Sequence, residues 1–478
     1  MRRLFLLLSL ALAGCAPFDP RPELTTNLAD AQRAVTAASL SGRTVATLVA
    51  SQGGIYRHDT AAALVEETLA DLVRAAGIEG LPATVAILNS PGYNAFSLPD
   101  GRIFLSRGML ALANDQAEIA AALGHELGHV ISRHVARRVV ERARAAADAA
   151  DVDRTFGDAD ITRATIVAHQ LSLAEFSRNQ ELEADRISIG LLAKAGYDPA
   201  ASLRMLQSLE RVAALSPKAA GGARRAASPV ATHPPTPERI AAVREELKKL
   251  PATGGRAGRD RYLAAIAGVA FGDDGAGGFV RGQIYVDPAR DIAMTLPKSW
   301  RVFATPSGFG ALKRDGDAIA LVTALGPAVA AAPEAAMRRL LAAASPEAAL
   351  APLPAGGAAG WAAAFERENT SFRLAIFTRG ETAWRVVFGA KPRGPDFDAD
   401  FARTLASIRA PDARDRSLAR PLALRVARAD GPDALRRLAG RAGDAENGAD
   451  LILAINGLSA PGAIHPGASL KIPDFATP

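Results

Sequence analysis

The sequence predicts an α+β multidomain protein: a mainly helical domain with a small edge sheet, then an α+β domain, then a small βααβ domain. Three observations support this prediction. The length of 478 residues suggests about three domains of roughly 150 residues each. A Gly-rich stretch at residues 272–282 separates a helical part from a part rich in short β-type runs. An Ala/Gly/Ser/Pro-rich stretch at residues 213–231 is predicted to be a flexible loop inside the first domain.

Residues 1–14 have the pattern of a signal peptide. Arg2 and Arg3 precede an apolar run, Leu4–Ala13, that is too short to span a bilayer. Cys15 is the only cysteine, and with the preceding Leu12-Ala13-Gly14 it resembles a bacterial lipobox. We therefore expect Cys15 to be lipidated and residues 15–55 to form a lipid-anchored N-terminal segment. The alternative is a signal peptide that is cleaved without lipid attachment.

The first domain, residues 56–282, carries His125-Glu126-Leu127-Gly128-His129 within a predicted helix that begins at an Asp115/Glu118 capping-box pattern. Residues four apart lie on one helix face, so His125 and His129 can bind one ion while Glu126 borders the same site. A catalytic zinc takes three protein ligands and leaves a fourth position for water. A carboxylate at the position of Glu126 can accept the proton of that water.

A second predicted helix offers the third ligand. Glu181 and Asp185 share one face of it, whereas Glu183 is turned about 200° away from Glu181. Glu181 is the better ligand candidate, and Asp185 is expected to accept a hydrogen bond from the outer nitrogen of a ligating histidine. Taken alone, this run also fits an ordinary acidic helix. The sequence assigns no role to the histidines that lack partners at ligand spacing: His58, His134, His169 and His465.

The order of these motifs resembles the HtpX/BepA family of membrane-associated gluzincin peptidases over roughly residues 60–250. The similar segments are 94–96, 101–110, 123–129, 181–186, 195–199 and 232–240. The resemblance implies a zincin-type metallopeptidase domain that holds zinc through His125, His129 and Glu181. It also implies that Glu126 is the catalytic carboxylate and that His233 and Arg239 are active-site residues that steady the oxyanion.

Two features of this domain each have two possible roles. His233 is also a candidate fourth metal ligand that would block the water position and make its loop a gate. The run Ile103–Ser106 is expected to be a strand that edges the cleft and pairs with an extended substrate, and the alternative is a purely structural strand.

Residues 283–412 are predicted to form an α+β accessory domain that acts as a binding or spacer module, since nothing in it has catalytic spacing. The expected strands are 292–296, 301–304, 318–325, 372–377 and 382–388, with helices at 334–344 and 398–408. Residues 418–478 resemble a LysM module, a βααβ unit that binds glycans containing N-acetylglucosamine. Gly431-Pro432-Asp433 stands where such modules carry Gly-Asp-Thr, which leaves glycan binding open.

Together these features predict a zinc-dependent endopeptidase anchored by lipid in the bacterial cell envelope, with misfolded or misassembled envelope proteins as substrates. Ala16, in place of an aspartate retention signal, favours the outer membrane and the periplasmic side. The alternative is an assembly chaperone or a peptidoglycan-binding lipoprotein with little proteolysis. No nucleic-acid partner is expected, because aromatic residues make up 5% of the chain and no nucleic-acid-binding motif occurs.

Overall fold

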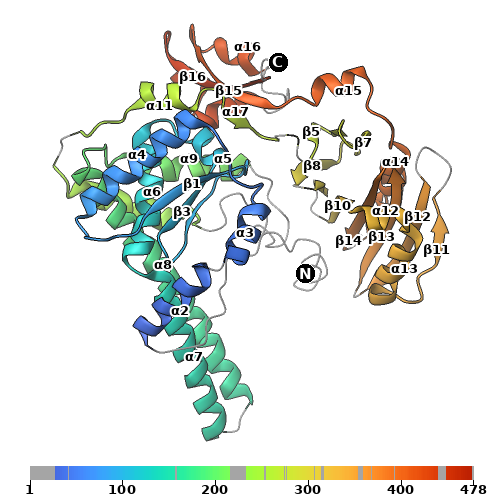
Figure 1. Ribbon diagram of the computed structural model, residues 1–478, viewed down its shortest axis with the longest axis horizontal. Helices are drawn as coiled ribbons and strands as arrows, with labels where there is room; N and C mark the ends of the chain where they lie inside the picture. The colour runs from blue at the N-terminus through green and yellow to red at the C-terminus, as the bar shows by residue number, and fades with distance from the viewer. Residues whose placement is uncertain are drawn as a thin grey trace.

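The computed structural model describes residues 27–475 except 41, 157–158, 216–232, 252–253, 274, 276, 306, 314–316, 354–358, 368, 392 and 440–447. Cys15 and the signal-peptide pattern lie outside these residues. A helical domain and an antiparallel sheet domain lie side by side, and the C-terminal strands return to the helical domain (Figure 1). Within the described part of the chain, no helix combines the length and apolar character needed to cross a membrane.

The first domain surrounds helix α6 (Gln116–Ile131), in which every residue from Gln116 to His129 is buried. Asp115 starts the helix by accepting a hydrogen bond from the Glu118 N–H at 2.8 Å, as the capping pattern predicts. The Glu118 carboxylate accepts from the Asn114 N–H at 2.9 Å. The helix carries His125, Glu126 and His129 into the domain core. The other elements of the first domain, besides its small sheet, are α2 (Leu28–Leu40), α3 (Gly42–Ser51), α4 (Asp59–Ala76), α5 (Arg107–Leu112), α7 (His134–Phe156), α8 (Ala159–Lys194), α9 (Ala201–Leu215), α10 (Pro237–Lys248), α11 (Arg259–Ile266) and β4 (Ala270–Phe271).

A small sheet lies beside α6, with the strand order β1 (Thr84–Leu88), β3 (Arg102–Ser106) and β2 (Ala95–Ser97). Strand β3 is parallel to β1 and antiparallel to β2. The expectation that Ile103–Ser106 edges the cleft is therefore wrong, because both edges of β3 are already hydrogen-bonded. Strand β2 is the edge strand next to α6.

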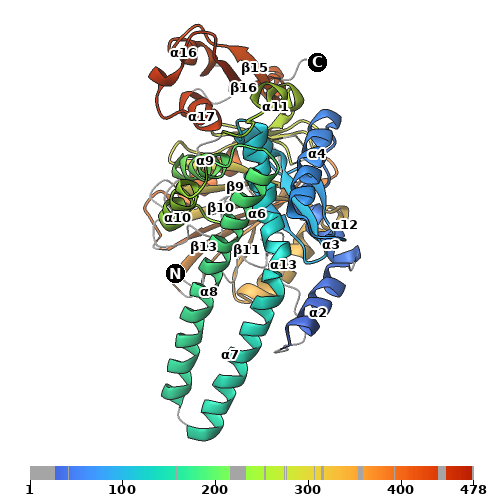
Figure 2. The same cartoon turned by 90° about the vertical axis from the view of Figure 1, so that its left-hand side faces the viewer.

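Helices α7 and α8 form a long hairpin that extends away from the rest of the molecule (Figure 2). The part of α8 that contains Ala184 and Ser188 lies directly against α6, and Gly124 and Gly128 of α6 allow this close approach. A Cβ atom at Gly124 would lie 2.8 Å from Ser188 Oγ, and one at Gly128 would lie 3.1 Å from the Ala184 Cα atom. The close packing brings the acidic residues of α8 to the histidines of α6.

The second domain is built on a seven-stranded antiparallel sheet in the order β11-β12-β13-β14-β10-β9-β8. The expected strands and helices of this domain are confirmed as β7, β8, β10, β13, β14, α13 and α14, with bounds that differ by a few residues at most ends. The hairpin of β5 and β6 spans the domain boundary expected at residue 282. Val280, before that boundary, already packs on the hydrophobic core of the second domain. The elements are β5 (Phe279–Arg281), β6 (Ile284–Asp287), β7 (Ile292–Thr295), β8 (Trp300–Thr305), β9 (Gly308–Lys313), β10 (Ala318–Leu325), α12 (Pro327–Ala331), α13 (Pro333–Ala344), β11 (Leu350–Pro352), β12 (Ala359–Arg367), β13 (Thr370–Arg379), β14 (Thr382–Ala390), α14 (Phe397–Ala406) and α15 (Ala413–Leu418).

The C-terminal elements follow a β, α, α, β order: β15 (Leu422–Arg428), α16 (Ala434–Ala439), α17 (Gly448–Ile455) and β16 (Ser469–Phe475), with a short 3-10 helix at Pro461–Ala463. Strand β15 pairs with β16 on one side and with β4 on the other. Leu424, Ala454 and Ile455 belong to the same core as α6. This unit is therefore packed into the first domain, and the seven-stranded domain is inserted between β4 and β15.

Candidate metal centre

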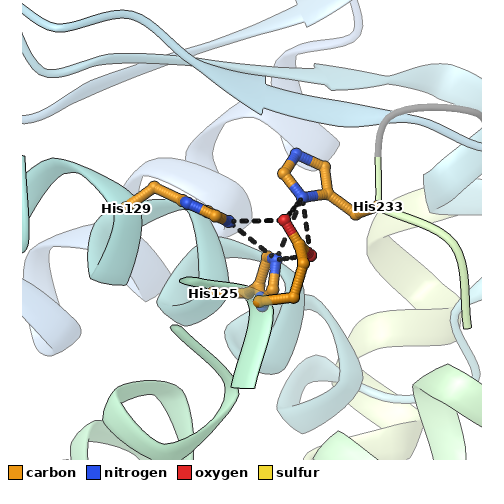
Figure 3. Close-up of side chains that lie close together, drawn as sticks. His125, His129 and His233 are labelled. Atoms are coloured by element: carbon orange, nitrogen blue, oxygen red, sulfur yellow. Dashed lines mark hydrogen bonds and ion pairs between the residues drawn. The ribbon is translucent and has the colours of Figure 1, made fainter. Parts of the chain in front are cut away.

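Four side chains from three parts of the first domain converge on one point. His125 and His129 come from consecutive turns of α6, Glu181 comes from α8, and His233 comes from the segment before α10. The three imidazole rings point toward one another (Figure 3). Among the described residues, these four form the group whose nitrogen and carboxylate oxygen atoms could hold a metal ion, all within 4.8 Å of one another.

The distances between these donor atoms fit a tetrahedral zinc site. His125 Nε2 lies 3.1 Å from His129 Nε2 and 3.2 Å from His233 Nδ1. The Glu181 carboxylate oxygens lie 3.3 Å from His125 Nε2, 3.5 Å from His129 Nε2 and 2.9 Å from His233 Nδ1. Ligands about 2.0–2.2 Å from a tetrahedral zinc are separated by roughly 3.3–3.6 Å. The mixed imidazole and carboxylate set also matches the chemistry that zinc prefers.

His125 is oriented from behind by Asp185, as the sequence analysis predicts for that residue. Asp185 Oδ1 lies 2.9 Å from His125 Nδ1, the nitrogen that faces away from the other donors. Burial alone would lower the pKa of His125. The hydrogen bonds with Asp185 and Glu181 have the larger opposite effect, and the net result is a pKa raised to about 9. In the metal-free protein the two carboxylates therefore hold a proton on the His125 ring, and zinc must displace that proton to bind.

Arg239 contacts this pair directly, and it also lines the cavity next to the donor atoms. Its Nε and Nη2 atoms donate to both oxygens of Asp185 at 2.8 and 2.7 Å. Its Nη1 atom donates to the backbone carbonyls of His233 and Pro234 and lies 3.2 Å from the Glu181 carboxylate. Burial raises the pKa of Asp185, but the Arg239 and His125 contacts lower it more. These contacts favour a role in positioning Asp185 and His233, and the oxyanion role expected for Arg239 stays a prediction.

Glu126 is buried next to the donor atoms without belonging to them. Its Oε2 atom accepts a hydrogen bond from Ser97 Oγ at 3.0 Å, and its Oε1 atom lies 3.5 Å from His233 Nε2. Ser97 belongs to the edge strand β2, so the strand and the carboxylate are held together. Sequence reasoning did not identify Ser97, because its contact with α6 depends on how the sheet packs.

A mostly apolar cavity adjoins these groups. His125, Glu126 and His233 line its polar end. Its walls come from β2 and the two residues before it, and from α5, α6, α8, α9 and α10: Tyr93, Asn94, Ala95, Met109, Ala121, Ala122, Asp185, Ser188, Ser202, Met205, Leu206, Leu209 and Arg239. A concave apolar site with a few convergent polar groups is typical of substrate-binding sites.

Two residues that the sequence analysis left without a role also reach this centre. His134 contacts His129, and Glu183 contacts His134. Among the other unassigned histidines, His58 binds the carbonyl of Ala267, far along the chain from HExxH. His169 lies in α8 at a position whose side chain is not described.

The HExxH helix, the carboxylate ligand on a second helix and the buried glutamate beside them define an HExxH zinc metallopeptidase domain. Residues 59–247, within this domain, match the model of peptidase family M48. The family fits the expectation drawn from the ordered motifs, and its zinc chemistry fits the donor set.

Proteins similar to this chain include three metallopeptidases. The chain is 33% identical to mitochondrial metalloendopeptidase OMA1 of Arabidopsis thaliana over 28% of this chain and 27% of that protein. It is 28% identical to the OMA1 protein of Schizosaccharomyces pombe over 38% of this chain and 52% of that one. It is 29% identical to metalloprotease YcaL of Escherichia coli over 37% of this chain and 68% of YcaL. The chain thus spans about a quarter and about half of the two OMA1 proteins.

Proposed function

We propose that this protein is a zinc-dependent endopeptidase that cleaves extended segments of other proteins. One observation carries the proposal: the buried Glu126 carboxylate lies between the zinc donors and the edge strand β2, at the polar end of a cavity. This arrangement brings a proton acceptor, a set of metal donors and an edge strand together in one site. The M48 domain and its metalloendopeptidase relatives support the same activity.

The residues of this site have separate proposed roles in peptide hydrolysis. Zinc bound at these donors supplies a Lewis acid that lowers the pKa of water. Glu126 accepts a proton from the attacking water and transfers it to the leaving amine. Ser97 holds the Glu126 carboxylate in place, and Asp185 with Arg239 holds His125.

The substrate backbone is proposed to pair with β2. Strand β2 is hydrogen-bonded to β3 along one edge, and it has no strand partner on its other edge among the described residues. An extended peptide can add to such an edge through its backbone groups. The strands inside a folded sheet are already paired, so the proposed substrates are unfolded chains or loop segments.

His233 supports a second part of the proposal, namely that the site is capped in this conformation. Its Nδ1 atom lies 3.2 Å from His125 Nε2 and 2.9 Å from Glu181 Oε1, close enough to support a role as the fourth donor around a metal. A catalytic zinc needs that place for water. Movement of His233 away from the donors therefore precedes hydrolysis.

We further propose that the enzyme works in the bacterial cell envelope on misfolded or misassembled envelope proteins, and that a lipid on Cys15 anchors it to the outer membrane. The lipobox-like sequence before Cys15 supports the anchor. The C-terminal βααβ unit is proposed as a LysM-like module, with peptidoglycan as its ligand class. Its order of elements supports this assignment.

A protease assay tests the activity. Residues 16–478 should degrade a permanently unfolded protein, a zinc chelator should abolish the degradation, and added zinc should restore it. The His233→Ala variant belongs in the same assay, because a capped wild-type site could show little turnover. Degradation that continues unchanged in chelator would contradict the proposal, and so would the absence of degradation by both proteins when loaded with zinc.

A further inference from the structure

His134 lies directly behind the zinc-binding histidine His129. It is the first residue of α7 and its side chain is fully buried. The Nδ1 atoms of His134 and His129 are 2.7 Å apart. Since His129 Nε2 is the atom that faces His125 and Glu181, the contact with His134 uses the nitrogen that points away from the metal donors.

This contact fixes where the ring protons are. A histidine that binds zinc through Nε2 carries its remaining proton on Nδ1. His129 Nδ1–H must therefore donate, and His134 Nδ1 must accept. The proton of His134 then lies on Nε2, which faces Glu183 Oε2 at 3.3 Å. Each atom in this chain of three residues has the partner that its role requires.

Glu183 is held in turn by two donors. Ser132 Oγ donates to its Oε1 atom at 3.0 Å, and Arg137 Nη1 donates to its Oε2 atom at 3.1 Å. The Gln180 amide donates to the His134 carbonyl at 3.0 Å, which fixes the start of α7. The chain reaches this arrangement through Arg133, whose φ of 52° lies in the left-handed region and turns α7 back toward α6.

We propose that His134 and Glu183 are positioning residues that hold His129 in the ring orientation and tautomer needed to bind zinc. This inference rests on the proposed function, since it assigns the support of one zinc ligand. It gives each ligating histidine its own support from α8: Asp185 acts on His125 directly, and Glu183 acts on His129 through His134. Within five residues, α8 supplies a metal ligand and both supporting carboxylates.

The test measures zinc affinity by competition with a chelator, together with thermal unfolding of the metal-free protein. His134→Phe removes the acceptor for His129 while filling the space, and it should weaken zinc binding by about 10–100-fold. His134→Asn places an amide oxygen close to the position of Nδ1 and should stay within a few fold of wild type. Unchanged affinity in His134→Phe overturns the proposal, and equal losses in the two variants overturn it as well.

Glu183→Ala provides a second variant, because the Glu183 side chain is 35% exposed and its truncation leaves the core of the domain in place. It should also weaken zinc binding, by less than His134→Phe, and an unchanged affinity counts against the proposal even if His134→Phe does not fold. Val139→Ala is the matched control: Val139 is buried on α7 and packs in an apolar cluster with Val35, and it is not one of the three hydrogen-bonded residues His129, His134 and Glu183. It should lower the unfolding temperature and leave zinc affinity unchanged.

These outcomes separate the inference from the proposed function. If wild-type protein binds no zinc, the proposed function fails. If wild-type protein binds zinc and Glu181→Gln does not, but the His134 and Glu183 variants bind zinc like wild type, only the inference about His134 and Glu183 fails.

Discussion

His233 Nδ1 lies 3.2 Å from His125 Nε2 and 2.9 Å from a Glu181 carboxylate oxygen, and its proposed role as a cap at the fourth donor position determines what its removal should do. In His233→Ala the position becomes available to water, so proteolytic activity should rise while zinc content stays at about one ion per chain. The measurement is kcat and KM on an unfolded substrate, with metal analysis of the same sample. The alternative role, steadying the oxyanion, would instead lower kcat by roughly 10²–10³-fold. Wild-type activity in this variant would contradict both roles.

At the scale of residues, local spacing was sufficient to predict much of the site. His125 and His129 share a helix face, and the same rule separates Glu181 and Asp185 from Glu183. The role of His134 could not be predicted this way, because a residue five positions after His129 would point elsewhere on a continuous helix. His134 returns to His129 only because α6 ends and Arg133 adopts a left-handed conformation. A third histidine soon after HExxH was the one available signal.

At the scale of elements, the C-terminal strand β16 supports the helix that precedes α6. Lys471 is fully buried, and its Nζ atom donates to the carbonyls of Ala111 and Leu112, at the end of α5, at 2.8 and 3.0 Å. It also donates to the carbonyl of Ala113. The carbonyls at the end of a helix have no partner within that helix. At the end of α5 they accept hydrogen bonds from a residue about 360 positions later.

The variant Lys471→Met should destabilise the first domain by about 3 kcal/mol, because it removes the buried amine that donates to three backbone carbonyls. Chemical denaturation of residues 16–478, followed by a signal from the first domain, measures the change. Lys248→Met is the matched control, since that side chain is 70% exposed and its pair with Glu245 contributes little. Equal stabilities of the two variants would show that β16 does not support α5.

The strands show the limits of sequence patterns at this scale. The β-type runs of the second domain could be located from their composition, and so could the helices at 334–344 and 398–408. The run Ile103–Ser106 was recognised as a strand, but its place in the sheet was not, since an apolar pattern does not reveal how many neighbours a strand has. The two glycines that bring α8 against α6 also gave no local signal of their function.

At the scale of the whole molecule, the chain returns to its first domain after building a second one. The pairing of β4 with β15 closes this path, and the core of the first domain includes Leu424, Ala454 and Ile455 of the C-terminal unit. A division into successive domains could not anticipate this, because the pairing joins residues about 150 positions apart (Leu422 with Phe271). The C-terminal unit is thus part of the support of the peptidase domain in addition to any ligand it binds.

The proposed anchor gives a prediction about where the whole molecule is found. The variant Cys15→Ser removes the only thiol that could carry a lipid, so it should lose incorporation of a labelled fatty acid and leave the outer-membrane fraction. Membrane fractionation of cells that produce the wild-type protein or the variant measures this. The Cys15→Ser protein should keep the zinc content of wild type. A variant that still fractionates with the outer membrane would contradict the lipobox interpretation.

The central claim is that His125, His129 and Glu181 hold the zinc and that Glu126 does the chemistry. The most direct test measures zinc content and proteolysis together in two carboxamide variants, each made in the His233→Ala background so that capping cannot mask activity. Glu126→Gln should retain about one zinc per chain and lose cleavage, whereas Glu181→Gln should lose most of its zinc. Undiminished cleavage by Glu126→Gln, or full zinc content in Glu181→Gln, would contradict the account.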